Sequence, residues 1–303
     1  MTKAGRPAPG AIQIIPKPPF VRLPDPARLF ADRAARFRRL AEGHALASYL
    51  RFLAGVAEAQ SEVAGGLPDP EPRFGPARER ADGQALPPLD RAATGRGDEA
   101  TMLLDRFVVA AARVEMPPAA AEALRRVAEA DAARRDAMVA GVLADAAPFE
   151  AMAEHAMVAA ALQVGFARRA GVLDPEALRL VGDGVCPVCG GPPVASLVVG
   201  WRNAEGTRFC ACSLCGTLWN YVRAKCALCA STRSITLREL EGGNGTIKAE
   251  ACGDCRGYVK VLYQQKDPDL DPVADDVASL GLDLLMREAG FRRGAVNPFL
   301  VGY

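Results

Sequence analysis

The chain has 303 residues, of which 50% are hydrophobic and 24% charged, and its formal net charge is +1. A globular chain of this length can bury a substantial core in two or three domains. Residues 181–303 carry 13 Lys or Arg against 13 Asp or Glu. Nucleic-acid-binding proteins usually show a basic excess, so the balanced charge argues against a nucleic-acid partner.

The first 26 residues are rich in proline and lack the apolar core of a signal peptide. The adjacent Arg38 and Arg39 precede a polar, helical pattern, so we interpret them as an exposed helix face rather than an export signal. The longest apolar run, residues 156–166, is too short to cross a bilayer. We therefore expect a cytoplasmic protein without membrane insertion, in a compartment where cysteines stay reduced.

Helical periodicity dominates residues 26–180. An apolar stripe at steps of four, three and four residues runs through Leu46, Leu50, Leu53 and Ala57. Helices are predicted at 26–60, with a break near Gly43, and at 103–114, 118–145 and 148–170. Ala-rich helices with short connections favour an antiparallel bundle. We assign residues 1–180 to an α-helical domain.

Within this domain, residues 65–99 combine Gly, Pro and charged residues without any period. Such a segment can bury little apolar surface, and we predict that it is a mobile linker.

Eight of the nine cysteines form four Cys-x-x-Cys pairs. Adding 40 to the first four numbers gives the second four, so the chain contains the repeat Cys186, Cys189, Cys212, Cys215 and Cys226, Cys229, Cys252, Cys255. One Cys-x-x-Cys turn supplies two thiolates, and a second turn completes a closed tetrahedral site. The repeat therefore predicts a duplicated metal-binding module.

Two arrangements of the pairs are compatible with the spacing. In one, each copy of the repeat holds its own ion. In the other, Cys212 and Cys215 share an ion with Cys226 and Cys229. The repeat favours the first arrangement. Four sulfur ligands suit both zinc and a single iron ion, and the spacing does not choose between them.

Between the cysteine pairs, each module contains a predicted hairpin. Residues 197–201 and 207–211 flank a turn in the first module, and residues 235–237 and 247–251 flank the sequence GGNG in the second. The glycines after Cys189 and Cys215 are expected to adopt positive φ. A strand should follow Cys255, and a last helix should span about 272–289. We predict an α+β protein: the helical domain, modules at 181–220 and 221–303, and a C-terminal helix.

The remaining candidate residues have simpler interpretations. Cys210 lies outside the repeat and is expected to be a buried strand residue, although a reactive thiol is the alternative. We interpret His44 and His155 as structural, and Asp275 and Asp276 as acidic residues at a helix start. No catalytic constellation was recognised, which favours a protein that is not an enzyme.

The cysteine-bearing half resembles a known family. The segments CSLCGTLWNYVRAKCALC and AEACGDCRGYVKVLYQQKDPDLDPVADDVASLGLDLLM, and the late NPFL, are similar to the bacterial formate dehydrogenase accessory proteins of the FdhE family. HALASYLRFLAGVAEAQ extends the resemblance to the helical half. The specific part of the resemblance covers about residues 184–300.

This resemblance implies a cytoplasmic, chaperone-like maturation factor that binds the catalytic subunit of a formate dehydrogenase. It also implies two rubredoxin-like modules, with iron favoured over zinc. Two alternatives remain: a rubredoxin-type electron carrier or thiol oxidoreductase, and, with less support, a zinc-ribbon protein that binds nucleic acid.

Overall fold

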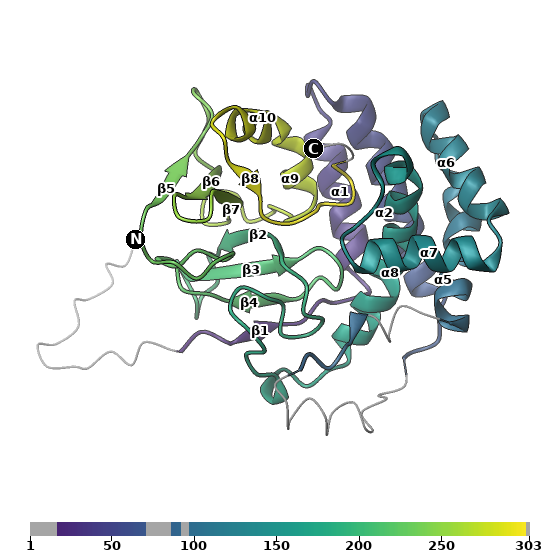
Figure 1. The fold of residues 1–303 in the computed structure, drawn as a ribbon, viewed down its shortest axis with the longest axis horizontal. Helices are drawn as coiled ribbons and strands as arrows, with labels where there is room; N and C mark the ends of the chain where they lie inside the picture. Colours follow the sequence, from purple (N-terminus) through teal and green to yellow (C-terminus); the bar gives the residue numbers. More distant parts are fainter. Residues whose placement is uncertain (1–16, 71–85, 92–96, 301–303) are drawn as a thin grey trace, which may run out of the picture.

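The computed structural model describes residues 17–70, 86–91 and 97–300. A group of helices lies beside a mixed sheet, and two further helices cover part of that sheet (Figure 1). The helices of the first half are α1 (Leu29–Leu40), α2 (Ala47–Gly65), α5 (Asp98–Ala111), α6 (Pro118–Glu129), α7 (Ala132–Leu143) and α8 (Met152–Gly171), with short 3-10 turns at Phe149–Ala151 and Pro175–Ala177.

Helix α8 is the centre of the helical half, because it packs against α2, α5, α6 and α7. The break expected near Gly43 separates α1 from α2, and Gly43 has φ +67°. Arg38 and Arg39 have exposed side chains on α1, as predicted. The helix predicted at 118–145 is instead divided, because the carboxylate of Asp131 accepts a hydrogen bond from Arg134 N and so caps a new helix, α7.

The predicted linker, 65–99, is only partly described. Its residues 71–85 and 92–96 lie outside the described residues, and α5 already begins at Asp98. The short stretch 86–91 lies against the first cysteine module, where Leu89 is buried and its N–H donates to Val188 O at 2.9 Å.

Both cysteine modules belong to one eight-stranded sheet. Its strands are β1 (Val21–Arg22), β2 (Pro193–Val198), β3 (Arg208–Cys212), β4 (Leu218–Asn220), β5 (Ile235–Arg238), β6 (Ile247–Cys252), β7 (Gly257–Tyr263) and β8 (Arg292–Arg293). The order is β1-β4-β3-β2-β7-β6-β5, with β8 also paired to β7. The predicted hairpins are β2–β3 and β5–β6, both antiparallel.

The modules are joined by the parallel pairing of β2 with β7, in register from Ala195↔Lys260 to Val198↔Tyr263. Arg208 of β3, which is buried, reinforces this junction with an ion pair at 2.9 Å to the half-buried Glu250 of β6. β4 of the first module has β1 as its outer neighbour. A segment from the start of the chain therefore completes the sheet of the cysteine modules.

The C-terminal region differs from the single helix predicted at 272–289. It contains α9 (Ala274–Ala278) and α10 (Leu280–Glu288), which meet at Ser279. The Ser279 hydroxyl donates to Asp275 O at 2.7 Å, and the Lys260 ammonium donates to the carbonyls of Asp276 and Ser279 at 2.7 and 3.1 Å. These bonds occupy carbonyls that a continuous helix would use, and the chain bends there.

Arginines of α1 bind the acidic segment that follows β7. Arg33 pairs with Asp271 at 3.2 Å, and Arg36 pairs with Asp275 at 2.6 Å. Burial raises the pKa of Asp275 to about 6, partly offset by Arg36. Asp275, which the sequence predicts to lie at a helix start, is thus also one half of a buried ion pair between distant parts of the chain.

Beside this contact lies a second buried network. Lys260 of β7 approaches Asp283 of α10 at 2.5 Å and Asp276 of α9 at 3.2 Å, and Arg293 of β8 pairs with both carboxylates. Burial opposes ionisation of Asp276, but the charges of Arg293 and Lys260 outweigh it and lower the pKa of this carboxyl. The network ties the sheet to both C-terminal helices.

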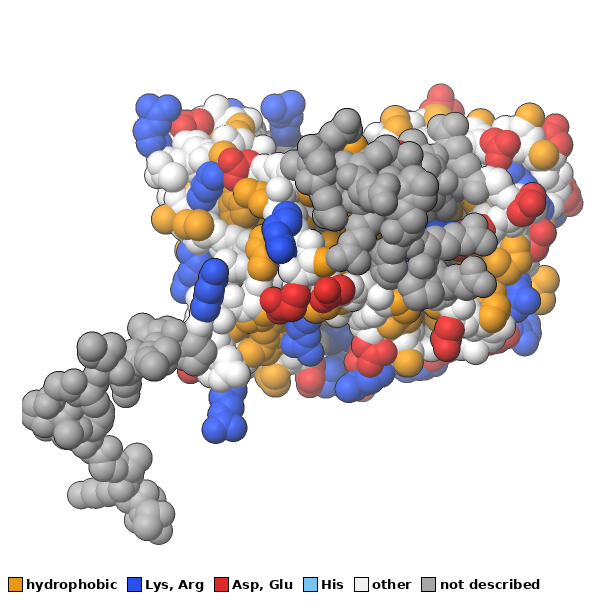
Figure 2. All heavy atoms as spheres, turned by 90° about the horizontal axis from the view of Figure 1, so that it is seen from below, with side chains coloured by type: hydrophobic (Ala, Val, Ile, Leu, Met, Phe, Trp, Pro, Cys, Tyr) orange, Lys and Arg blue, Asp and Glu red, His pale blue; other side chains and the backbone are white. Residues whose placement is uncertain are grey.

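The largest hydrophobic core extends from the helices into the first cysteine module and includes Cys186, Cys189, Cys212 and Cys215. Two smaller cores lie at the sheet, one around Leu197 and Phe209 and one beneath α10. Among the described residues, no helix is long and apolar enough to cross a membrane. The face shown in Figure 2 mixes basic, acidic and apolar side chains.

We expect Lys260→Met to destabilise the fold strongly, because it leaves Asp276 and Asp283 buried with only Arg293 to balance them. Breaking a buried pair in this way costs about 3–5 kcal/mol. Urea unfolding should show the loss as a lower midpoint. The control is Lys248→Met, which removes a partly exposed ion pair with Glu239, the residue after β5, and should leave the midpoint almost unchanged. Equal midpoints for the two variants would contradict the prediction.

Candidate metal centres

Each Cys-x-x-Cys pair sits in a tight turn held by backbone hydrogen bonds. In the first turn of each module, the N–H of the leading cysteine donates to the carbonyl five residues later: Cys186 to Gly191 and Cys226 to Ser231, both at 2.8 Å. The amides of Gly190 and Ala230 donate back to the leading cysteines. Equivalent positions thus have equivalent geometry, which supports the duplication.

The residue after the second cysteine has positive φ in all four turns. Gly190 and Gly216 have φ +75° and +72°, which confirms the prediction for the first module. Ala230 and Arg256 adopt φ +61° and +57° without the conformational freedom of glycine. A left-handed conformation costs a residue other than glycine about 1 kcal/mol or more. The second module therefore holds the same turns under more backbone strain.

The eight thiols gather in two groups of four, in the arrangement that the repeat favours. In each group the sulfur atoms lie within 4.8 Å of one another. Cys186–Cys215 and Cys189–Cys212 are separated by 3.6 and 3.4 Å, and Cys226–Cys255 and Cys229–Cys252 by 3.9 and 3.7 Å. A tetrahedral ion with metal–sulfur bonds of about 2.3 Å has sulfur–sulfur edges of about 3.8 Å. The spacing therefore fits one tetrahedral ion per group, and all nine cysteines are free thiols.

The electrostatics of the first quartet also fit a cation. Burial raises the pKa of Cys186 well above its ordinary value, whereas hydrogen bonds from Cys186, Cys189 and Cys215 lower that of Cys212. Four thiolates cannot be buried together without a compensating charge. Zinc and iron both supply that charge in a sulfur tetrahedron.

The two quartets differ in exposure. All four cysteines of the first quartet are buried, with at most 4% of the surface of each exposed. In the second quartet, Cys226 and Cys252 are buried, Cys255 is half-buried and Cys229 is exposed. The first quartet is packed against the helical half, where Gln163 of α8 donates to Ser213 O at 2.7 Å. The second has one side open to solvent.

The remaining candidates lie outside the quartets. Cys210 is fully buried in β3 opposite Trp219, and burial raises the pKa of its thiol to about 12. Both properties favour the structural interpretation over a reactive thiol. The ring of His44 contacts Ala278 O at 3.1 Å and accepts from Leu46 N, while His155 contacts Ala151 O at 2.7 Å. Both histidines thus make structural contacts with backbone groups.

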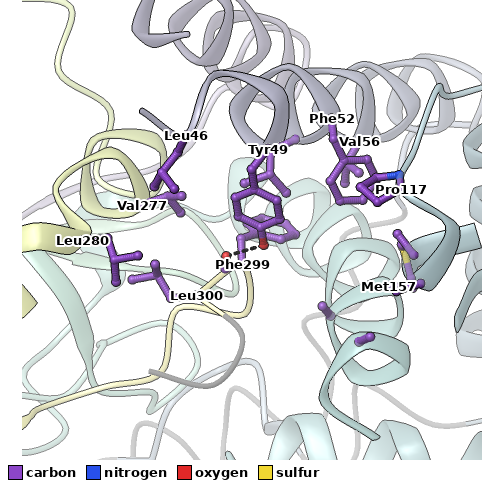
Figure 3. A pocket seen from close by; sticks show the side chains of 15 residues that line it. Leu46, Tyr49, Phe52, Val56, Pro117, Met157, Val277, Leu280, Phe299 and Leu300 are labelled. Atoms are coloured by element: carbon purple, nitrogen blue, oxygen red, sulfur yellow. Dashed lines mark hydrogen bonds between the residues drawn. The ribbon is translucent and has the colours of Figure 1, made fainter. Parts of the chain in front are cut away.

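An apolar pocket of about 360 Å³, with no cysteine in its lining, lies between the helical half and the C-terminal region (Figure 3). The pocket opens between α2, α8, the start of α6 and four C-terminal residues, Val277, Leu280, Phe299 and Leu300. Tyr49 points across it and donates to Phe299 O at 2.6 Å. The side chains labelled in Figure 3 are Leu46, Tyr49, Phe52, Val56, Pro117, Met157, Val277, Leu280, Phe299 and Leu300. No sequence pattern predicts this pocket, because it is assembled from segments distant in the chain.

Comparison with protein-family models gives three consecutive matches. Residues 18–183 match the model "FdhE, N-terminal", residues 185–223 match "FdhE, central domain", and residues 224–300 match "FdhE, C-terminal domain". Together these models span almost the whole of the chain.

Individual proteins agree with these matches. The chain is 49% identical to a Rhizobium meliloti protein named "Protein FdhE homolog" over 300 residues, 98% of each chain. It is 36% identical to "Protein FdhE" of Salmonella paratyphi B over 95% of this chain and 92% of that one. The crystal structure of the FdhE protein from Pseudomonas aeruginosa aligns with a TM-score of 0.83 and 30% identity, covering 94% of this chain and 99% of that one. The sequence, the fold and the paired cysteine quartets therefore place this chain in the FdhE family.

Proposed function

We propose that each cysteine quartet holds one metal ion: Cys186, Cys189, Cys212 and Cys215 in the first module, and Cys226, Cys229, Cys252 and Cys255 in the second. The sulfur spacing and the four similar turns support this proposal. The ions would cross-link the two turns of each module and hold the hairpins in place. Iron is favoured by the resemblance to the FdhE family, which implies rubredoxin-like modules, and zinc fits the same ligands.

We propose further that the chain is an accessory factor for a formate dehydrogenase, acting in the cytoplasm by binding the catalytic subunit, and that it is not itself an enzyme. The observation that carries this proposal is the full-length match to the FdhE family. A maturation factor must recognise an incompletely assembled partner and release it later, so a transient protein interface is the functional feature to look for.

The second module is the better candidate for that interface. Its quartet has an open side, and beside it lies a hollow of about 390 Å³ that is lined in part by Leu228, Cys255 and Arg292. The first quartet, by contrast, is enclosed by the helices and residues 86–91. A partner that docks on the second module would contact cysteine turns whose shape depends on the bound ion.

The exposed thiol of Cys229 also favours a second candidate function, that of an electron carrier with the second site as its redox centre. An electron carrier with iron would accept and return one electron repeatedly with an external donor. A docking factor needs no such turnover. Stopped-flow reduction and reoxidation of the iron-loaded protein separates the two functions.

Replacing one ligand should empty one site only. We expect Cys186→Ser to lower the bound metal from two equivalents to one, because the two quartets share no cysteine. Metal analysis of the purified protein measures the result. Cys210→Ser is the matched control, since it changes a buried cysteine outside both quartets and should keep both equivalents. Loss of both ions in Cys186→Ser would show that the sites depend on each other.

The second site should react first with added reagents. Because Cys229 is exposed and Cys255 is half-buried, we expect a chelator to withdraw the metal of the second quartet before that of the first. Mass spectrometry after iodoacetamide treatment should then find label on residues 226–255 before residues 186–215. Simultaneous labelling of both quartets would contradict the difference in exposure.

Client binding should depend on the second module. We expect Cys252→Ser to weaken capture of a formate dehydrogenase catalytic subunit more than Cys212→Ser does, because only the second module has an open quartet. Pull-down with the full chain measures capture, and circular dichroism checks that the helices persist. If the wild-type chain captured no such subunit, the proposed function would fail. If both variants kept full affinity, only the location of the interface would be wrong.

A further inference from the structure

Residues 86–91 bring a basic side chain to the first quartet. This stretch lies against the first cysteine turn: Leu89 N donates to Val188 O at 2.9 Å, and Pro87 lies beside Gly190. Leu89 is buried. This backbone hydrogen bond and the buried Leu89 side chain fix the position of Arg91, which follows two residues later.

Arg91 faces two of the four sulfur atoms. A Cβ atom placed on Gly191 would lie 3.4 Å from Arg91 Nη1 and 3.7 Å from the Sγ atoms of both Cys189 and Cys212. The Arg91 guanidinium group is therefore separated from the Cys189 and Cys212 sulfur atoms by a gap about as wide as a methyl group at Gly191. At this separation, in a partly desolvated site, a direct charge interaction is substantial.

The position of Arg91 is held from the other side by Asp145, which follows α7. The carboxylate accepts from Nη1 and Nη2 at 2.8 and 3.2 Å, and the Arg91 side chain is only 18% exposed. Burial opposes the charge on Arg91, but Asp145 and the two thiolates outweigh it and raise its pKa. The side chain is thus a fixed cation beside the quartet.

In the second module, the residue that corresponds to Gly191 has a neighbour of the opposite charge. Adding 40 to Gly191 gives Ser231, whose hydroxyl donates to the Asp254 carboxylate at 2.5 Å. The guanidinium of Arg233 is 3.6 Å from the same carboxylate, but its side chain is 84% exposed. The first quartet therefore has a half-buried cation beside it, whereas the second has a carboxylate in its second turn.

We propose that Arg91, anchored by Asp145, is a positioning residue of the first metal site, where its fixed charge strengthens metal binding and distinguishes this site from its repeat. The inference rests on the proposed occupation of the first quartet by a metal ion. A divalent ion with four thiolates carries a net charge of −2, so a nearby cation stabilises the complete complex. For iron, it also favours the reduced form, which is the more negative one.

The test uses the full-length Cys252→Ser protein as the parent, because the first site is then the intact one. Zinc affinity is measured by competition with a chelator. We expect Arg91→Gln to weaken zinc binding by about tenfold, the lower end of the range for lost outer-sphere partners. Arg91→Lys should restore most of the affinity, because it returns the charge. Arg135→Gln is the matched control: Arg135 is 17% exposed and pairs with Asp105 at 2.6 Å within the helical bundle.

Equal zinc affinity in folded Arg91→Gln and the parent would overturn this inference and leave the proposed metal site intact. A parent that bound no zinc or iron would overturn both. If circular dichroism showed that Arg91→Gln is unfolded, Asp145→Asn would be measured instead. This variant keeps the charge of Arg91 but removes the carboxylate that holds its side chain in place. Unchanged affinity in Asp145→Asn would then count against the inference.

Discussion

The parallel pairing of β2 with β7 is the contact on which the arrangement of both cysteine modules depends. It places the two copies of the repeat side by side in one sheet, with β4 as the outer strand of the first module and β5 as the outer strand of the second. β1 pairs with the outer edge of β4, whereas no strand among the described residues pairs with the outer edge of β5. Since the first module is also packed against the helices, the same pairing leaves the second module at the open end of the sheet.

The two quartets show how duplication permits divergence. Both keep the four turns, the positive φ values and the sulfur spacing, so both keep the geometry that a tetrahedral ion requires. What differs is the surroundings: helices and Arg91 enclose the first quartet, whereas solvent and Asp254 adjoin the second. Because metal affinity and exchange depend on these outer contacts as well as on the ligands, two sites with identical ligands need not behave identically.

Local patterns were sufficient to predict the features that depend on nearby residues. The constant offset of 40 located both quartets, and the glycines after Cys189 and Cys215 identified turns that need positive φ. The two hairpins followed from alternation around short turns. Each of these features is decided within a few residues, or by a repeat that can be counted along the chain.

Features that depend on distant contacts could not be read in this way. The division of the C-terminal helix at Ser279 reflects the Lys260 ammonium, which reaches its carbonyl from β7. Arg33 and Arg36 belong to no motif in the sequence, yet each pairs with an aspartate more than 230 positions away. Periodicity carries no signal for such partners, because an ion pair constrains only the two charged positions.

Arg91 illustrates the same limit at the candidate site. Its surroundings in the sequence, with frequent Gly, Pro and charged residues, indicate a linker, and that composition has no bearing on where a single arginine lies. Its location is instead set by three separate contacts: Leu89 on the first cysteine turn, Asp145 beyond α7, and the absence of a side chain at Gly191. A cation is stable in such a partly buried position when anions face it, and here those anions are Asp145 and the cysteine thiolates. In the proposed metal site, the cysteine ligands would therefore stabilise the position of Arg91 as much as Arg91 would stabilise the ligands, and we consider the two as one electrostatic unit.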